Sequence, residues 1–180
     1  MISLNLLLHR TSSRRSKLQA FVCAALLLCC LGLYAEPLTG KVTQVADGDT
    51  LTIVSENTQA IKIRLAGIDA PEKAQAFGQR SKEHLEALVN QKQVTVESNK
   101  KDKYGRNVGQ VLLNGQDVNL EQLRAGMAWF YRQYERELTP ELRERYVKAE
   151  DEAKAGRIGL WVDPKAAPPW QWRHPDRLDK

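Results

Sequence analysis

The chain has 180 residues, of which 27 are basic and 22 are acidic, and its formal net charge is +5. The first 35 residues hold four of the basic residues and no acidic residue, so the other 145 residues carry a net charge of only +1. This balance excludes a uniformly basic surface, and any attraction to phosphate must come from local patches. A segment of 145 residues suits one compact domain.

Residues 1–35 predict an export signal. The basic residues of this segment all precede Leu18, and an uncharged, almost wholly apolar run then extends to Ala35, where a small residue ends a suitable cleavage site. The alternative is an uncleaved membrane anchor, because the run is near the lower limit of about 17 residues for a spanning helix. All three cysteines lie in this segment, so the mature chain would have no disulfide in an oxidising compartment.

Five short strands are expected in the mature chain. Ile61, Ile63 and Leu65 alternate with Lys62 and Arg64, which is the pattern of a half-buried strand. Asn114-Gly115 is typical of a two-residue hairpin turn. The predicted strands cover residues 41–45, 51–54, 61–65, 94–97 and 108–113.

Three helices are expected among these strands. The first covers residues 74–89, after Pro71, which favours a helix start; the second runs from Asn119, as N-cap, to Gly126, with Gln122 at the capping-box position. The third opens at Thr139-Pro140 and stops at residue 156. The tail, residues 163–180, is rich in proline and tryptophan, and its proline content predicts no helix. This order suggests a small Greek-key barrel with packed helices.

Four acids and one arginine lie at the ends of two neighbouring predicted strands. Asp47 and Asp49 precede the second strand, Arg64 lies in the third, and Asp69 and Glu72 follow it. If the two strands lie side by side, these groups converge, and the acids repel one another strongly. A hard divalent cation with oxygen ligands is the simplest compensation.

Three motifs carry a family resemblance. V-A-D-G-D-T at 45–50, I-R-L-A-G-I-D-A-P-E at 63–72 and D-K-Y-G-R at 102–106 occur in this order. Together they resemble the staphylococcal nuclease (thermonuclease) family over roughly residues 38–161. The resemblance implies an α+β fold: a five-stranded Greek-key barrel of the oligonucleotide/oligosaccharide-binding (OB) type with about three packed helices, spanning residues 36–162.

The resemblance also implies a calcium site. Its ligands would be Asp49, Asp69 and the backbone carbonyl of Ala70, and Asp47 would be an acid outside the direct ligands that helps to position water. An all-oxygen site with few protein ligands suits calcium. Carboxylates without a neighbouring histidine or cysteine argue against zinc.

The same resemblance assigns catalytic and substrate-binding roles. Glu72 would be the general base, and Arg64 and Arg106 would clamp the scissile phosphate, since guanidinium groups bind phosphate oxygens in bidentate fashion. The expected substrate-binding residues are Lys103, Tyr104, Tyr131 and Tyr134. The register between the last two is open, and Trp129 is better explained as a core residue.

The implied activity is an exported, calcium-dependent, sugar-nonspecific endonuclease that cleaves DNA and RNA and leaves 3′-phosphate ends. The protein would be a periplasmic or secreted monomer with no predictable protein partner. Each motif taken alone also fits an ordinary turn, a helix start or a solvated loop. The alternative function is a nucleic-acid-binding module of the same fold without catalysis.

Overall fold

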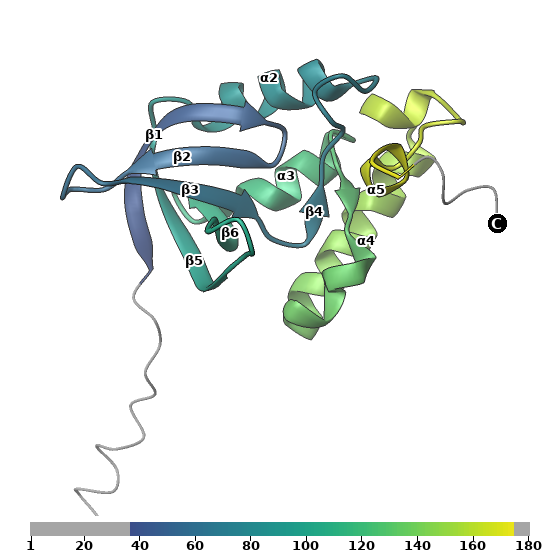
Figure 1. Cartoon of the computed structure of the whole chain (residues 1–180). Helices are drawn as coiled ribbons and strands as arrows, with labels where there is room; N and C mark the ends of the chain where they lie inside the picture. Colours follow the sequence, from purple (N-terminus) through teal and green to yellow (C-terminus); the bar gives the residue numbers. More distant parts are fainter. Residues whose placement is uncertain (1–36, 175–180) are drawn as a thin grey trace, which may run out of the picture. The chain divides into compact units, whose positions relative to one another are not determined.

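The computed structural model describes residues 37–174 (Figure 1). The expected export segment, residues 1–35, lies outside the described residues, as do the last six residues of the tail. Within the described range, no helix has both the length and the apolar character that crossing a membrane requires.

Five strands form a closed barrel. Antiparallel pairing gives the order β3-β2-β1-β5-β6, and parallel pairing of β3 with β6 closes the sheet. The arrangement confirms the expected OB-type barrel (Figure 1). The strands are β1 (Leu38–Asp47), β2 (Thr50–Val54), β3 (Ala60–Leu65), β5 (Gln93–Lys101) and β6 (Asn107–Leu113).

Two smaller pairings adjoin the barrel. Strand β7 (Gln116–Asp117) pairs with β6 after the expected turn at Asn114 and Gly115, which both have positive φ. Strand β4 (Ile68–Asp69) pairs with β8 (Trp129–Phe130), so Asp69 lies opposite Trp129. This second pairing places the chain after β3 against a segment sixty residues away in the sequence.

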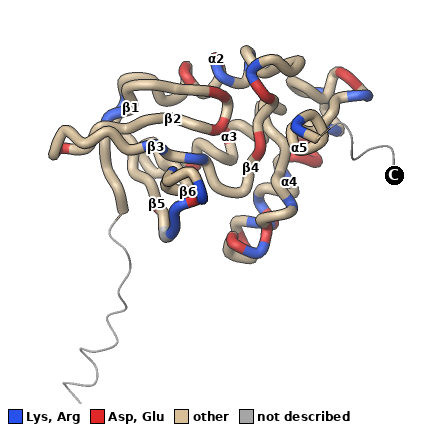
Figure 2. Tube along the Cα trace, in the orientation of Figure 1, with Lys and Arg blue, Asp and Glu red and all other residues tan. Residues whose placement is uncertain are grey.

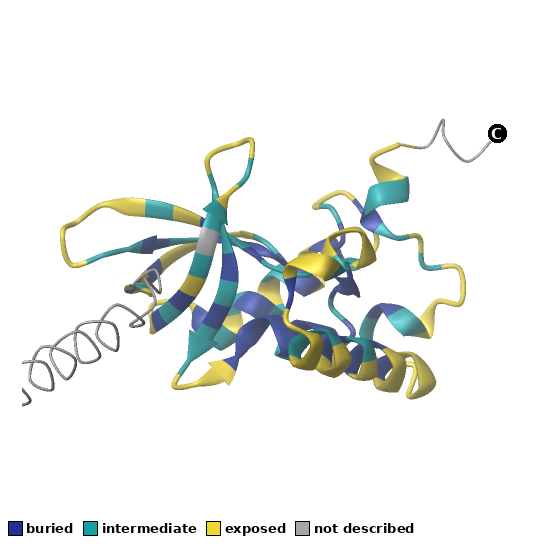
Figure 3. Cartoon of the chain, turned by 90° about the horizontal axis from the view of Figure 1, so that it is seen from below, coloured by how far each residue is buried: buried dark blue, intermediate teal, exposed yellow. Residues whose placement is uncertain are grey.

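Three longer helices pack on the barrel and on each other. They are α2 (Gly78–Val89), α3 (Val118–Arg124) and α4 (Pro140–Ala155), which confirms the expected number. Helix α2 packs on β1, and α3 packs on β6, α2 and α4. In Figure 3 the buried residues line the barrel interior and the helix faces turned toward it, and the outer face of α4 is exposed. Two 3₁₀ helices, η1 (Arg132–Glu137) and η2 (Gly159–Val162), and a short helix, α5 (Pro169–Trp172), complete the described chain.

The start of α2 differs from the prediction. The helix begins at Gly78 rather than at residue 74, and its N-cap residue Phe77 has a φ of 66°. The segment before it is a loop, in which Gln75 N donates to the carbonyl of Glu72 at 2.8 Å. A Cβ at Gly78 would lie 2.1 Å from that same carbonyl, so only glycine allows the close approach. Pro71 therefore does not start a helix.

The capping of α3 also differs from the prediction. The N-cap is Asp117, whose Oδ1 accepts from Leu120 N at 3.0 Å. Asn119 is instead buried, and its side chain bonds the backbone of Ala66 and Val111, on either side of the β3–β6 seam. Gln122, expected in a capping box, is also buried and donates to the carbonyl of Gly48 at 2.6 Å. Both side chains connect elements far apart in the sequence rather than capping their own helix.

The prediction that the tail holds no helix is wrong. Pro168 is the N-cap of α5 and Pro169 its first residue, where the missing N–H would have no partner within a helix. Proline forbids a helix interior and not a helix start. The tail therefore makes one turn, on the side of the barrel that carries β4 (Figure 1).

Candidate active site

Arg64 at the end of β3 holds the two central acids together. Its Nη1 donates to the carbonyls of Leu65 and Ile68, both at 2.8 Å. Its Nη2 donates to Asp69 Oδ1 at 2.9 Å and lies 3.1 Å from Asp49 Oδ2. Because the backbone fixes the guanidinium plane, the two carboxylates have a rigid cationic partner. The expected convergence of Asp49, Arg64 and Asp69 is found.

The turn between β1 and β2 is attached directly to the segment after β4. Asp49 Oδ2 accepts from Ala70 N at 2.6 Å, and Asp49 Oδ1 accepts from the Thr50 hydroxyl at 3.0 Å. Gly48 makes this approach possible, because a Cβ there would lie 1.7 Å from Ser81 Oγ. The sequence Asp-Gly-Asp is thus more than a surface turn: its second aspartate is buried against β4.

Burial disfavours the charged form of two acids at this site. Burial raises the pKa of Asp47 to about 7, and the charge of Asp49 is the second cause. Burial also raises the pKa of Asp69, against the hydrogen bond from Arg173 and the charge of Arg64. Such shifts mean that a further positive charge placed among these acids would be stabilised. In Figure 2 acidic segments occur at the β1–β2 turn and at β4.

The chemistry of the donors fits a hard divalent cation. Asp49 and Asp69 offer carboxylate oxygens that meet at Arg64, and Ala70, which adjoins Asp69, offers a backbone carbonyl. Oxygen ligands and space for water and phosphate suit calcium or magnesium better than a transition metal. Among residues 37–174, no group of three histidine, cysteine, aspartate or glutamate side chains is gathered closely enough to hold a metal ion. A cation here would therefore depend on backbone, water or phosphate oxygens as well.

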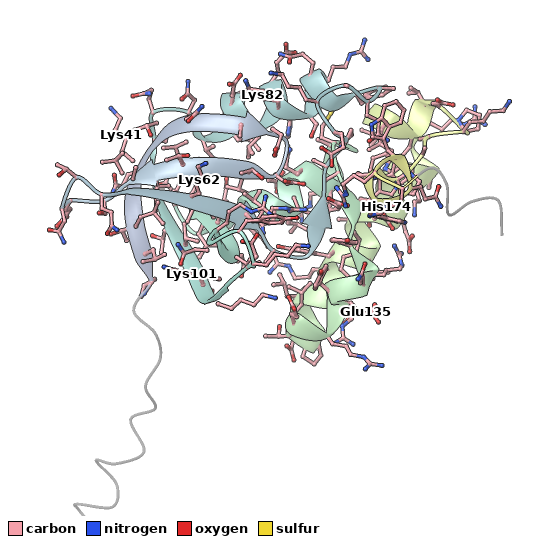
Figure 4. All side chains as sticks on the ribbon, in the orientation of Figure 1. Lys41, Lys62, Lys82, Lys101, Glu135 and His174 are labelled. Atoms are coloured by element: carbon pink, nitrogen blue, oxygen red, sulfur yellow. The ribbon has the colours of Figure 1, made fainter. Side chains whose placement is uncertain are left out.

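Glu72 shares its environment with an arginine that the sequence motifs did not include. Arg173, just after α5, donates from Nη1 to Glu72 Oε1 at 2.6 Å and from Nη2 to Asp69 Oδ2 at 2.7 Å. The residues lie about a hundred positions apart, and no spacing or periodicity connects them. The proline- and tryptophan-rich sequence of the tail, which ends at Arg173 in Pro-Pro-Trp-Gln-Trp-Arg, was a signal but gave no role. In Figure 4 the labelled His174, the next residue, lies on the side of the barrel that carries β4.

Arg106 is not brought into this cluster. Its Nε donates to Asp102 Oδ2 at 2.6 Å, and its guanidinium lies over the ring of Tyr104, 5.4 Å from the ring centre. In the described part of the chain, no hydrogen bond or ion pair joins Arg106 to Asp49, Asp69 or Glu72. The end of β5 and the loop that follows it, residues 100–106, hold four basic residues and one acidic residue (Figure 2).

The candidate substrate-binding side chains form two groups. Lys103 lies over the exposed ring of Tyr104, 5.0 Å from its centre, on the β5–β6 loop. Tyr131, which follows β8, stacks on Trp170 of α5 with ring centres 5.4 Å apart and planes 7° apart. The rings of Tyr134 and Tyr131 meet edge to face, with ring centres 4.9 Å apart. Burial raises the pKa of Tyr131, and the charge of Asp69 is the second cause.

Trp129 belongs to the core, as expected. It is 6% exposed, lies opposite Asp69 in the β4–β8 pair, and contacts the edge of Trp161 with ring centres 5.3 Å apart. The buried Glu150 of α4 accepts from Phe130 N at 2.9 Å and pairs with Arg132 and Lys154. These contacts fix β8, and through it the position of Asp69.

Comparisons with known proteins identify the family of the chain. The family described as staphylococcal nuclease homologue matches residues 62–163. The chain is 43% identical over 144 residues to an uncharacterized endonuclease of Haemophilus influenzae, which covers 80% of this chain and 78% of that protein. It is 37% identical over 170 residues to a micrococcal nuclease of Shigella flexneri, and the matched region covers 89% of this chain and 94% of that protein. Nucleases of this kind generally depend on a metal ion. The chain belongs to the staphylococcal nuclease family.

Proposed function

We propose that this phosphodiester-hydrolysing nuclease is an exported, calcium-dependent, sugar-nonspecific endonuclease that cleaves DNA and RNA to leave 3′-phosphate ends. The observation that carries the proposal is the cluster of Asp49 and Asp69 on the fixed guanidinium of Arg64. Glu72 lies three residues after Asp69 and shares Arg173 with it, so a base and two cation ligands occupy one place. A nucleic-acid-binding module would not need this arrangement.

The reaction follows from the groups present. Glu72 takes a proton from a water molecule as that water attacks phosphorus, the bond from phosphorus to the 5′ oxygen breaks, and that oxygen takes up a proton from solvent. The products are a 5′-hydroxyl and a 3′-phosphate. Calcium, held by Asp49, Asp69 and the Ala70 carbonyl, would offset the charge on the phosphoryl oxygens. Asp47 Oδ1 accepts from Asp49 N at 3.1 Å, so it supports the ligand from outside.

Substrate contacts would be made mainly to phosphate. Arg64 has an orientation fixed by two backbone carbonyls. Arg106 and Lys103, on the β5–β6 loop, and the aromatic rings of Tyr104, Tyr131 and Tyr134 supply further charge and stacking surface. Stacking and phosphate contacts carry little base identity, which agrees with cleavage of both DNA and RNA without strong sequence preference.

Export is proposed from residues 1–35 alone, with a periplasmic or secreted mature protein. The basic residues followed by an uncharged apolar run support this. Mass spectrometry of the exported protein should give a first residue near Glu36, whereas an intact Met1 would favour an anchor.

The function is tested by digesting plasmid DNA and RNA with the purified protein. Calcium should support cleavage of both, and an excess of chelator should stop it. Magnesium should be a poor substitute, because it demands stricter octahedral geometry and releases water reluctantly. Binding of single-stranded DNA without cleavage in calcium would establish the binding module instead.

A further inference from the structure

The tail is held across the site by three different contacts. Gln75 Nε2 donates to the carbonyl of Ala167, while Gln75 Oε1 accepts from Glu72 N at 3.1 Å. Trp170 stacks on Tyr131, and Arg173 reaches Asp69 and Glu72. One side chain, Gln75, thus connects the backbone of the base-carrying loop to the backbone of the tail. Trp170 lies in the single turn of α5, Arg173 directly follows that turn, and its first residue, Pro169, is buried.

Arg173 uses the same oxygens that the proposed chemistry needs. Its Nη2 lies 2.7 Å from Asp69 Oδ2 and its Nη1 lies 3.3 Å from Asp69 Oδ1. Arg64 also donates to Asp69 Oδ1. Both oxygens of Asp69 are therefore engaged by guanidinium groups, and Glu72 Oε1 accepts from Arg173 as well.

A guanidinium and a divalent cation cannot both contact these carboxylate oxygens without a large electrostatic repulsion. Like charges at contact distance repel, and the effect is larger in a partly buried site than in water. Docking of Arg173 thus opposes cation binding at Asp69, and it occupies Glu72 Oε1 at the same time.

We infer that the tail segment 167–173 is a built-in cap, in which Arg173 competes with the divalent cation for Asp69 and occupies Glu72 until the cation binds. The inference rests on the proposed function for the roles of these two acids. The two equilibria are linked: the factor by which the docked tail lowers the affinity for the cation equals the factor by which the bound cation lowers the equilibrium constant for tail docking. The cap is stabilised in addition by Trp170 on Tyr131, so undocking also opens the stacking surface of Tyr131.

The direct test is calorimetric titration of the purified protein with calcium alone. Arg173→Ala should bind calcium about five- to tenfold more tightly than wild type, which is within the usual range for coupling between sites. Arg173→Lys should lie between the two, because an ammonium keeps the charge but lacks the planar fork. The matched control is Lys165→Ala, which removes one charge from an exposed position of the same tail and should change calcium affinity little.

Tryptophan fluorescence reports docking without any nuclease assay. Calcium should change the emission of wild type as Trp170 leaves Tyr131, and Trp170→Phe should remove most of that change. Equal calcium affinity in Arg173→Ala and Lys165→Ala would overturn the cap. A large loss of turnover in Arg173→Ala at saturating calcium, with unchanged calcium affinity, would also overturn it and assign Arg173 to the substrate phosphate. If wild type never cleaves nucleic acid, the proposed function fails, and the titration still decides whether Arg173 and calcium compete.

Discussion

Glu72 lies in a loop six residues before α2, so its position is not explained by a favourable interaction with a helix start. Its carboxylate is nevertheless close enough to Asp69 for one guanidinium to bridge the two. This is the geometry expected when a base and a cation ligand act on one phosphate.

Glu72→Gln keeps the shape of the side chain and removes its basicity. We expect kcat to fall by about two to four orders of magnitude, the usual contribution of general-base catalysis. Single-turnover cleavage of a labelled oligonucleotide measures this, and DNA binding in calcium serves as the control that should change little. Unchanged turnover would remove Glu72 from the mechanism.

Arg64 and Arg106 are distinguished by their surroundings. Arg64→Ala removes the partner of both Asp49 and Asp69, whereas Arg106→Ala removes a side chain whose described ion pair is with Asp102. Each substitution should cost roughly 3 kcal/mol or more in kcat/KM, and lysine should rescue only partly. Only Arg64→Ala should also weaken the packing of the acids, which a thermal melt without calcium would detect. Near wild-type kcat/KM in either alanine variant would exclude that arginine from the proposed binding of the scissile phosphate.

Asp117 gives a pH prediction that is independent of the site. Burial raises its pKa, against hydrogen bonds from Leu120 N, Gln110 and Tyr146. A carboxyl with a raised pKa in the fold favours the fold most when protonated, so its contribution to the free energy of unfolding falls as pH rises through that pKa. Asp117→Asn keeps an N-cap oxygen but has no carboxyl to ionise, so the free energy of unfolding of this variant does not fall for this reason as pH rises. Urea unfolding from pH 4 upward should show the variant gaining on wild type as pH rises; a constant difference would contradict the assignment.

At the scale of elements, the β1–β2 turn couples the barrel to the site. Gly48 fits between Ser81 of α2 and Ala70, whose Cβ would lie 2.8 Å from a Cβ at position 48. Gly48→Ala should therefore destabilise the fold by about 1–3 kcal/mol, as overpacking does, and weaken calcium binding by displacing Asp49. Denaturant unfolding and calcium titration measure the two effects. Ser81→Gly in the same background should restore part of the stability; wild-type stability in Gly48→Ala alone would show that the turn adjusts freely.

Elements with local signals were predictable from the sequence. Thr139 caps α4 and Pro140 is its first residue, as their chemistry favours, and Asn114-Gly115 makes the expected hairpin turn. Gly156 ends α4 as expected, but with a φ of −78°, and the positive φ after the helix falls on Arg157. The prediction for Asn119 was wrong because a buried amide that bridges two strands looks like an N-cap when only its neighbours in sequence are considered.

The convergence of Asp49, Arg64 and Asp69 was predictable because Asp49 directly precedes β2, Arg64 lies near the end of β3, which pairs with β2, and Asp69 follows β3 closely. Arg173 was not, since its contact depends on how the tail returns over the barrel. Local patterns in sequence contain no information about that return.

For the whole molecule, charge is organised locally rather than globally. The acids at β4 and at the β1–β2 turn are flanked by a basic β5–β6 loop (Figure 2). The C-terminal tail, which is distant from them in the sequence, supplies one further arginine. The proposed cation-binding site, the proposed phosphate-binding loop and the arginine inferred to compete with the cation thus lie within one small domain. Cation concentration is therefore the variable to which the molecule should respond most strongly.

Calcium-dependent catalysis at this site is tested by cleavage of a 5′-labelled single-stranded DNA by the purified protein, in calcium and in excess chelator. We expect cutting only with calcium, and products whose mobility shifts after phosphatase treatment because they carry 3′-phosphates. Full activity in chelator would contradict the cation site built on Asp49 and Asp69. Tight binding without any cutting in calcium would contradict catalysis by Glu72.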